Sequence, residues 1–215
     1  MWYIQVMDEN IYHIYNRGIE KRDIFVDRGD YIRFLNILCF FNDVNPVDFF
    51  NLSKGGSTSL AEVEPPDQAK KLVEILCFCL MPNHYHFILK SLTENGIANF
   101  MKKLGTGYTM YFNKKYQRSG HLFQGRYKHR EINSEDGFMY LSGYIHLNHV
   151  IAKIVNLPEE YKYSSYLDFL GQKNYDFLSA NKDFMDAKPE AYKKFVLELK
   201  SDKELFKKVE DVNIE

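Results

Sequence analysis

The sequence predicts an α+β fold of the ferredoxin-like type, in which helices pack on an antiparallel sheet. The first observation is the order of its segments, because strand-forming and helical stretches follow one another as strand, helix, strand, strand, helix, strand, helix. The second is size, since 215 residues of which 45% are apolar suit one domain with extensions. Helices that all pack on one antiparallel sheet satisfy both observations.

The first strand and the first helix are indicated by their composition and by the turn and capping residues at their ends. Residues 11–15 are rich in strand-forming side chains and stop at the turn Asn16-Arg17-Gly18. Apolar residues then recur at helical spacing over residues 31–38. Asp27 or Asp30 is the expected N-cap of that helix, because a short acidic side chain can accept a hydrogen bond from the first turn.

A hairpin follows in the middle of the chain. Residues 72–81 form a buried strand, Pro82-Asn83 makes a tight turn, and residues 84–89 return as a second strand. Residues 51–70, which contain two adjacent glycines, two adjacent prolines and several acids, are expected to form a loop insertion. This segment is not a domain linker, because the hairpin after it completes the same core.

The second half repeats the pattern of helix, strand and helix. The sequence predicts a long helix over residues 97–116 and a strand over residues 122–132. Ser134, followed by two acids, opens a last core helix that runs to about Val155. Residues 172–215 are expected to form a C-terminal helical extension, with fraying over residues 198–215.

The net charge of −1 conceals a strong local asymmetry. Residues 96–130 hold eight basic side chains and no acidic one, so a charge of +8 here is balanced by −9 in the other 180 residues. The balance excludes a protein coated in positive charge, while the basic stretch indicates local binding of a polyanion. The eight side chains are those of Lys102, Lys103, Lys114, Lys115, Arg118, Arg126, Lys128 and Arg130.

Cysteine usage and hydropathy indicate a cytoplasmic protein. Cys39, Cys77 and Cys79 cannot all pair with one another, and we expect them to be reduced and buried. No apolar run approaches the roughly 20 residues that a membrane-spanning helix needs, so no membrane partner is expected.

His84 and His86 are the strongest indication of chemistry. Alternate residues of a strand face the same side, so the two imidazoles project together while Tyr85 turns to the opposite face. Two neutral imidazoles side by side make half of a site for a divalent metal. The spacing alone is weak evidence, because two histidines exposed on a sheet face would show the same pattern.

Tyr144 and Asn148 lie one turn apart on the helix that Ser134 opens. The amide oxygen of Asn148 suits a cation, whereas His146 points roughly 200° away from Tyr144 around the helix. A phenol is a poor nucleophile at neutral pH because its pKa is about 10. It becomes competent where a metal polarises a phosphate and aligns it for attack. On its own, Tyr144 is equally well explained as a tyrosine that packs on the sheet.

The sequence around these residues resembles the HUH single-tyrosine transposases of the IS200-like type, especially the REP-associated tyrosine transposases. The resemblance covers about residues 10–171. Five ordered strings carry it: Tyr12-His13-Ile14-Tyr15-Asn16-Arg17-Gly18, Met81-Pro82-Asn83-His84-Tyr85-His86-Phe87-Ile88-Leu89, Gly120-His121-Leu122-Phe123-Gln124-Gly125-Arg126-Tyr127-Lys128, Tyr144-Ile145-His146-Leu147-Asn148 and Tyr163-Ser164-Ser165-Tyr166.

The resemblance implies an HUH endonuclease domain over residues 1–171 that cleaves and transfers single-stranded DNA. Tyr144 matches the catalytic nucleophile, which holds the 5′ phosphate and releases a 3′ hydroxyl. His84, His86 and Asn148 match the ligands of a divalent metal, Mg²⁺ or Mn²⁺. Hairpin DNA is the implied partner, and the chain is expected to be a monomer or a homodimer. One departure is His149, which stands where the family usually has a proline.

The expected DNA contacts combine the basic stretch with one arginine of the first strand. Their positive charges suit the phosphate backbone of DNA. The residues are Arg17, Lys102, Lys103, Lys114, Lys115, Arg118, Arg126, Lys128 and Arg130.

Three other functions compete with this interpretation. Tyr140 lies one turn before Tyr144, and that spacing also occurs in two-tyrosine initiators of rolling-circle replication. A domesticated, non-catalytic protein that binds DNA hairpins would keep the fold and the basic stretch. An RNA-binding module of the same architecture is disfavoured, because its characteristic aromatic string is absent from the sequence.

Overall fold

The protein is described by a computed structural model of residues 10–45, 70–179 and 189–201. The predicted insertion at residues 51–70 lies outside these ranges except for Lys70. The part of the predicted frayed end beyond Ser201 also lies outside them.

Four strands form one antiparallel sheet within the described residues. They are β1 (Ile11–Arg17), β2 (Val73–Met81), β3 (His84–Ser91) and β4 (Lys128–Glu131), in the order β2-β3-β1-β4. The two strands of the predicted hairpin, β2 and β3, are neighbours, and β1 is inserted between β3 and β4. This order and the helices between the strands confirm the predicted α+β fold with an antiparallel sheet.

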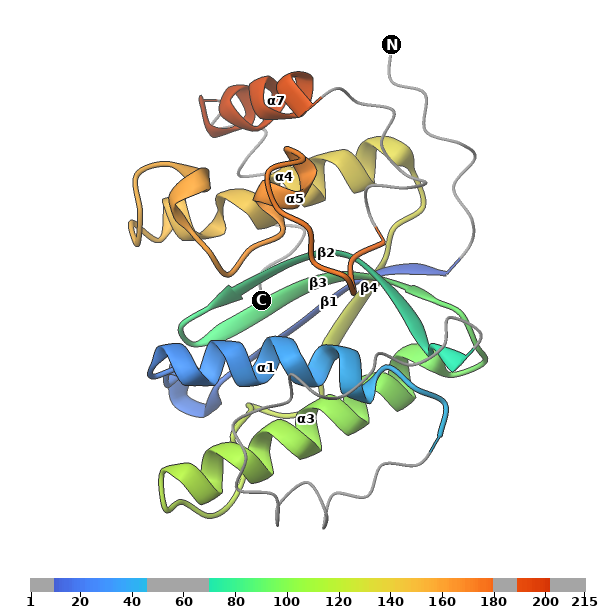
Figure 1. The fold of residues 1–215 in the computed structure, drawn as a ribbon, viewed down its shortest axis with the longest axis vertical. Coiled ribbons are helices and arrows are strands. Elements are labelled where there is room, and N and C mark those ends of the chain that lie inside the picture. Colours follow the sequence, from blue (N-terminus) through green and yellow to red (C-terminus); the bar gives the residue numbers. More distant parts are fainter. Residues whose placement is uncertain (1–9, 46–69, 180–188, 202–215) are drawn as a thin grey trace.

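Helices cover both faces of the sheet (Figure 1). On one face lie α1 (Arg28–Phe41) and α3 (Gly96–Lys115). On the other lie α4 (Glu135–Ile151), the short α5 (Tyr166–Phe169) and α7 (Pro189–Ser201). Because successive side chains of a strand point to opposite faces, the sheet separates two apolar cores.

The predicted helix starts are confirmed, and one helix end is corrected. Asp27 caps α1 and forms a reciprocal capping box with Asp30. Ser134 caps α4 by accepting a hydrogen bond from the backbone of the first turn. However, α4 ends at Ile151 and not near Val155, because the chain reverses through Lys153, whose φ is 58°.

The predicted strand over residues 122–132 is too long. Only β4 is paired as a strand, and residues 122–127 cross the end of β1 through isolated hydrogen bonds. Leu122 and Phe123 explain the difference, since both are buried in the same core although adjacent side chains of a strand point to opposite faces. The backbone amide of Gln124 donates to the carbonyl oxygen of Arg17 instead of continuing a ladder.

The segment after α4 covers the outer edge of β2. The amide of Leu80 donates to the carbonyl oxygen of Tyr163, and the amide of Ser165 donates to that of Phe78. Such cover protects a sheet edge that would otherwise expose unpaired backbone groups. The helix α7, which falls within the predicted extension, packs on the outer side of α4 (Figure 1). The boundary at residue 171 stays a prediction.

Two further expectations concern cysteines and membranes. All three cysteines are free thiols; Cys77 and Cys79 are buried, whereas Cys39 is only half-buried because it lies on the outer side of α1. Within the described parts of the chain, no helix combines the length and the apolar character needed to cross a membrane.

Candidate active site

His84 and His86 lie side by side on the face of β3 that α4 covers. Their ring centroids are 5.1 Å apart and their planes are nearly perpendicular. Tyr85 faces the opposite core, where its ring lies 5.5 Å from that of Phe34. The predicted division of these side chains between the two faces is therefore what the structure shows.

Each histidine is held through its Nδ1 atom. His84 Nδ1 lies 2.5 Å from Asn83 Oδ1, and Asn83 is itself oriented because its Nδ2 donates to the carbonyl oxygen of Lys21. His86 Nδ1 lies 2.9 Å from Nε2 of His13, a buried residue of β1. Both rings thus turn their Nε2 atoms away from these partners.

Both histidines are neutral at physiological pH. Burial, and then the positive charge of Arg17, lower the pKa of His84 to about 4, against an opposing hydrogen bond with Asn148. Burial also lowers the pKa of His86 far below its usual value, and His13 and His84 add to this effect. A neutral imidazole keeps the lone pair that metal coordination requires.

Tyr144 and Asn148 of α4 face this histidine pair. The ring centroid of Tyr144 lies 6.2 Å from that of His86, and the two planes are perpendicular. The Nδ2 atom of Asn148 donates to the carbonyl oxygen of Tyr144 at 3.5 Å, and its side chain lies close enough to His84 to affect the pKa of that histidine. Tyr144 is only 2% exposed, whereas Asn148 and His84 are half-buried, so the site opens to solvent on the side of Asn148 and His84.

The donors present fit a divalent metal held by two imidazoles and one amide oxygen. His86 Nε2 is buried and has no hydrogen-bond partner among the described residues, which is costly for a polar atom unless a ligand binds it. No cluster of three His, Cys, Asp or Glu side chains with metal-binding geometry occurs in the described ranges. Beside the two histidines, Asn148 offers an oxygen donor of another kind.

Tyr140 lies away from the histidine pair. Its ring packs 5.6 Å from that of Phe195 on α7, on the side of α4 that is turned from the sheet. His146 also points away from the site and is buried against Tyr192 and Ser165. The two tyrosines of α4 therefore have different surroundings.

Three of the predicted DNA contacts lie on the histidine face. Arg17 pairs with His84 across β1 and β3, and residues that are directly paired share a face of the sheet. By the same argument, Lys128 and Arg130 of the exposed edge strand β4 stand on this face. The ammonium group of Lys128 lies 5.9 Å from the ring centroid of Tyr15, which is stacked with His86.

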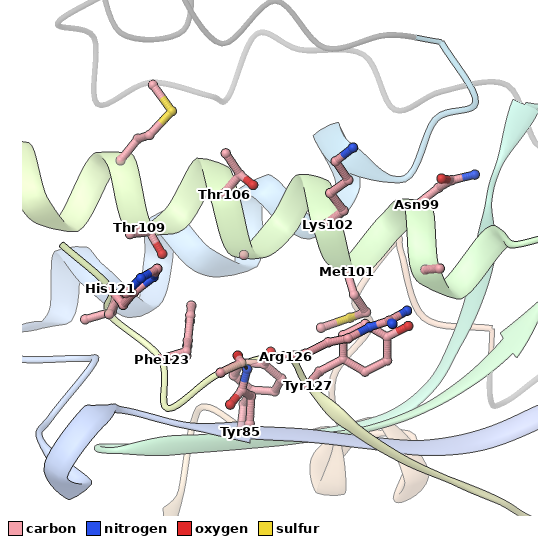
Figure 2. Close-up of a pocket in the computed structure, with 16 residues that line it drawn as sticks. Tyr85, Asn99, Met101, Lys102, Thr106, Thr109, His121, Phe123, Arg126 and Tyr127 are labelled. Atoms are coloured by element: carbon pink, nitrogen blue, oxygen red, sulfur yellow. Dashed lines mark hydrogen bonds between the residues drawn. The ribbon is translucent and has the colours of Figure 1, made fainter.

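Two other predicted contacts line a cleft of about 730 Å³ on the opposite side of the sheet. The cleft runs between α3 and residues 121–127, with Lys102 on the helix and Arg126 across from it (Figure 2). Tyr85 reaches its floor from β3, and Tyr127 lies at one side. Among the residues that the structure describes, none that lines this cleft is acidic.

The remaining predicted contacts are engaged within the protein or lie elsewhere on α3. Lys115 forms ion pairs with Asp27 and Asp30 at 2.7 Å. Lys103 donates to backbone carbonyl groups after α1, and Arg118 donates to Asn113. Lys114 is exposed on α3. The basic residues of the stretch 96–130 are therefore divided between the two faces of the sheet. They do not form one continuous surface.

His13, Tyr15 and Asn83 belong to the site but were not among the residues predicted for it. His13 and Tyr15 alternate with Arg17 on β1, so a period of two would have placed all three on one face. The missing information was the register of β1 against β3, because it alone pairs Tyr15 with His86.

A comparison with known protein families matches the part of the chain that contains the candidate active site. The family described as "Transposase IS200 like" matches residues 52–148. The predicted resemblance to the IS200-like transposase family is confirmed. The matched stretch holds all four residues that this resemblance assigns to the site, namely His84, His86, Tyr144 and Asn148.

A solved structure described as a REP-associated tyrosine transposase bound to a REP hairpin has the same fold. The two chains share 9% sequence identity with a TM-score of 0.51, over 83% of this chain and 96% of that chain. A search of curated protein sequences found no match.

His149, which departs from the usual proline of the IS200-like transposases, is fully buried. Its ring stacks on Tyr161 with centroids 4.4 Å apart, and its Nε2 lies 3.2 Å from the carbonyl oxygen of Pro158. These contacts hold the end of α4 next to Asn148 without a proline, so Tyr144 and Asn148 keep the common face that was predicted.

Proposed function

We propose that this chain is a metal-dependent endonuclease and strand transferase for single-stranded DNA that recognises a DNA hairpin. The observation that supports it most strongly is the meeting of Tyr144 and His86 across α4 and β3, with ring centroids 6.2 Å apart. The residues that the IS200-like resemblance assigns to nucleophile and metal come from elements about 60 residues apart in sequence, and they face one another within one chain.

The proposed step is an exchange of one phosphodiester bond for another. Tyr144 Oη attacks the phosphorus, a bond forms between Oη and phosphorus, and the bond between phosphorus and the 3′ oxygen breaks. The phenol loses its proton and the leaving 3′ oxygen gains one. The 5′ phosphate stays attached to Tyr144, which preserves the bond energy for transfer to a new 3′ hydroxyl.

His84, His86 and Asn148 would hold the divalent metal. When bound, the metal polarises the phosphate and lowers the cost of the charge that develops on it. The protein contributes neutral imidazoles, an amide oxygen and a tyrosine held by the packing of α4 on the sheet. These groups need little rearrangement before attack, which favours catalysis.

The basic residues on the two sides of the sheet are assigned to different parts of the DNA. Arg17, Lys128 and Arg130 lie beside the histidines, so they are suited to the phosphates of the strand that is cut. Lys102 and Arg126 line the cleft on the other side, which we assign to the hairpin. A hairpin is also what the solved transposase of the same fold binds, according to its description.

The two alternative functions, a two-tyrosine initiator and a protein that only binds hairpins, would require different arrangements of Tyr140 and His86. A two-tyrosine initiator would need Tyr140 at the site, yet Tyr140 packs against Phe195 of α7. A protein that only binds hairpins would not need His86 Nε2 to be buried without a hydrogen-bond partner among the described residues. Both observations favour catalysis by one tyrosine.

The test is to incubate the protein with labelled single-stranded oligonucleotides that carry hairpins from the DNA beside its own gene. We expect a covalent protein–DNA adduct with Mg²⁺ or Mn²⁺ and none with a chelator. Mass mapping is expected to find the phosphotyrosyl peptide at Tyr144. Hairpin binding with no adduct under either condition would leave only the binding function.

A further inference from the structure

His13 is a fully buried histidine placed directly behind the candidate metal ligand His86. It lies on β1, and its Nε2 is 2.9 Å from His86 Nδ1. The ring of His13 lies edge to edge with that of His86, with centroids 5.2 Å apart and planes within 11° of parallel, and the ring of Tyr15 packs close to both, with centroids 4.8 Å from His13 and 5.9 Å from His86. The hydrogen bond from β1 and the packing of Tyr15 beside both rings fix the position of the ring of His86.

The hydrogen bond has a consequence for the proton on His86. A neutral imidazole carries one proton, and the nitrogen without it is the one that can bind a metal. If His13 Nε2 accepts the hydrogen bond, the proton of His86 is on Nδ1 and its Nε2 presents a lone pair. The reverse arrangement would place the proton of His86 on Nε2 and block that atom as a ligand.

We propose that His13 is a positioning residue that accepts a hydrogen bond from His86 Nδ1 and thereby keeps His86 Nε2 ready to bind the metal. The inference rests on the proposed function, because it assigns a metal to His86. Asn83 has the equivalent place for His84, where its Oδ1 atom meets Nδ1 at 2.5 Å. Both histidines are thus held in the same way, by an acceptor at Nδ1.

The choice of an imidazole for this buried position has a physical reason. His13 and His86 are 0% and 3% exposed, so a carboxylate at residue 13 would be an uncompensated charge whenever the metal was absent. A neutral acceptor orients His86 without that cost. Partners of this kind orient ligating histidines in many metal sites, and their removal typically lowers metal affinity about 10–100-fold.

The first measurement uses the metal-free wild-type protein. Long-range ¹H–¹⁵N correlation spectra of ¹⁵N-histidine protein report which ring nitrogen of His86 carries the proton, with His86→Gln used to assign its signals. We expect the proton on Nδ1. A proton on Nε2 would overturn the inference, whether or not the protein cleaves DNA.

The second measurement compares His13→Leu, which cannot accept a hydrogen bond, with His13→Gln, whose side-chain oxygen can. We expect Mn²⁺ affinity, followed by electron paramagnetic resonance, to fall about tenfold or more in His13→Leu and to recover in His13→Gln. Tyr140→Phe, on the side of α4 that is turned from the histidines, is the control and is expected to keep the wild-type Mn²⁺ affinity. Equal Mn²⁺ affinity in wild type and a folded His13→Leu would overturn the inference.

The two measurements separate this inference from the proposed function. If the wild-type protein has the Nδ1 proton but forms no DNA adduct, the positioning of His86 stands and the nuclease does not. If the adduct forms while His86 carries its proton on Nε2, the nuclease stands and the role of His13 fails. Hairpin binding, which uses the opposite side of the sheet, is expected to be the same in all variants.

Discussion

The ring of Tyr144 stands perpendicular to the ring of His86, with 6.2 Å between centroids, where α4 crosses β3. One residue comes from a helix and the other from a strand, so their contact depends on how α4 packs on the sheet. Tyr140, one turn earlier, is directed to α7 instead. The structure therefore distinguishes two tyrosines that the sequence places at equivalent helical positions.

Substitution of each tyrosine by phenylalanine tests that distinction. We expect Tyr144→Phe to abolish the covalent adduct with a labelled hairpin oligonucleotide, because it removes the attacking oxygen and keeps the ring. Tyr140→Phe is expected to retain most of the adduct, measured by denaturing gel electrophoresis. An equal decrease in the two variants would favour the two-tyrosine scheme, and full activity of Tyr144→Phe would exclude it as nucleophile.

Asn148 is expected to act through its amide oxygen. Asn148→Asp keeps an oxygen donor of similar size and adds a charge that a divalent cation favours, so Mn²⁺ affinity should be maintained or increased. Asn148→Leu removes the oxygen donor. Loss of a residue that only orients a ligand lowers metal affinity about 10–100-fold, so we expect loss of a ligand itself to lower Mn²⁺ affinity and adduct formation by roughly 100-fold or more. Isothermal titration with Mn²⁺ checks both. Equal affinity in Asn148→Leu and wild type would remove Asn148 from the ligand set.

Local spacing was sufficient to predict the parts of the site that lie within one element. His84 and His86 share a face because a strand has a period of two, and Tyr144 and Asn148 share one because a helix has a period of 3.6. The order of strands and helices also predicted the fold. These patterns depend only on neighbours in sequence, so they survive in the structure.

The parts that join two elements could not be predicted in this way. His13 meets His86 only because Tyr15 is in register with His86, and strand register is set by the packing of both cores. Lys115 was expected to bind DNA, but its neighbour in space is Asp30, which lies 85 residues away in sequence. Charge along the chain does not reveal which charges meet in the fold.

The two basic surfaces predict separable effects on DNA binding. Lys102→Gln with Arg126→Gln, in the cleft, is expected to weaken hairpin binding and to lower the slope of log affinity against log salt by about one for each phosphate that is no longer neutralised. Cleavage of an unstructured single strand should be unchanged. Lys128→Gln with Arg130→Gln should reduce that cleavage and leave hairpin affinity nearly intact. Fluorescence anisotropy over a salt series measures the binding, and identical behaviour of both pairs would contradict the division.

Lys115 is predicted to stabilise the fold more than it binds DNA. Burial opposes its charge, but hydrogen bonds to Asp27 and Asp30 outweigh this and raise its pKa, while the pKa of Asp27 is lowered by the same interaction. Asp30 is fully buried, so Lys115→Gln leaves a buried carboxylate with less compensation. We expect a decrease of about 2 kcal/mol in the free energy of unfolding. Urea denaturation measures it, with Lys114→Gln on the same helix expected to change stability by less than about 0.5 kcal/mol.

The hydrogen bond between Tyr192 and His146 predicts that α7 supports the helix that carries the nucleophile. Tyr192 is fully buried, and its hydroxyl lies 2.7 Å from His146 Nδ1 and 3.1 Å from Ser142 Oγ. Tyr192→Phe leaves these buried groups of α4 with fewer hydrogen bonds, which typically costs about 1–3 kcal/mol.

The free energy of unfolding is expected to fall by that amount in urea, and adduct formation is expected to fall with it as α4 loosens over the histidines. Lys194→Gln is the control, because it disrupts only an exposed ion pair with Glu198 on α7. If Tyr192→Phe were less stable but formed the adduct at the wild-type rate, α7 would stabilise the fold without positioning Tyr144.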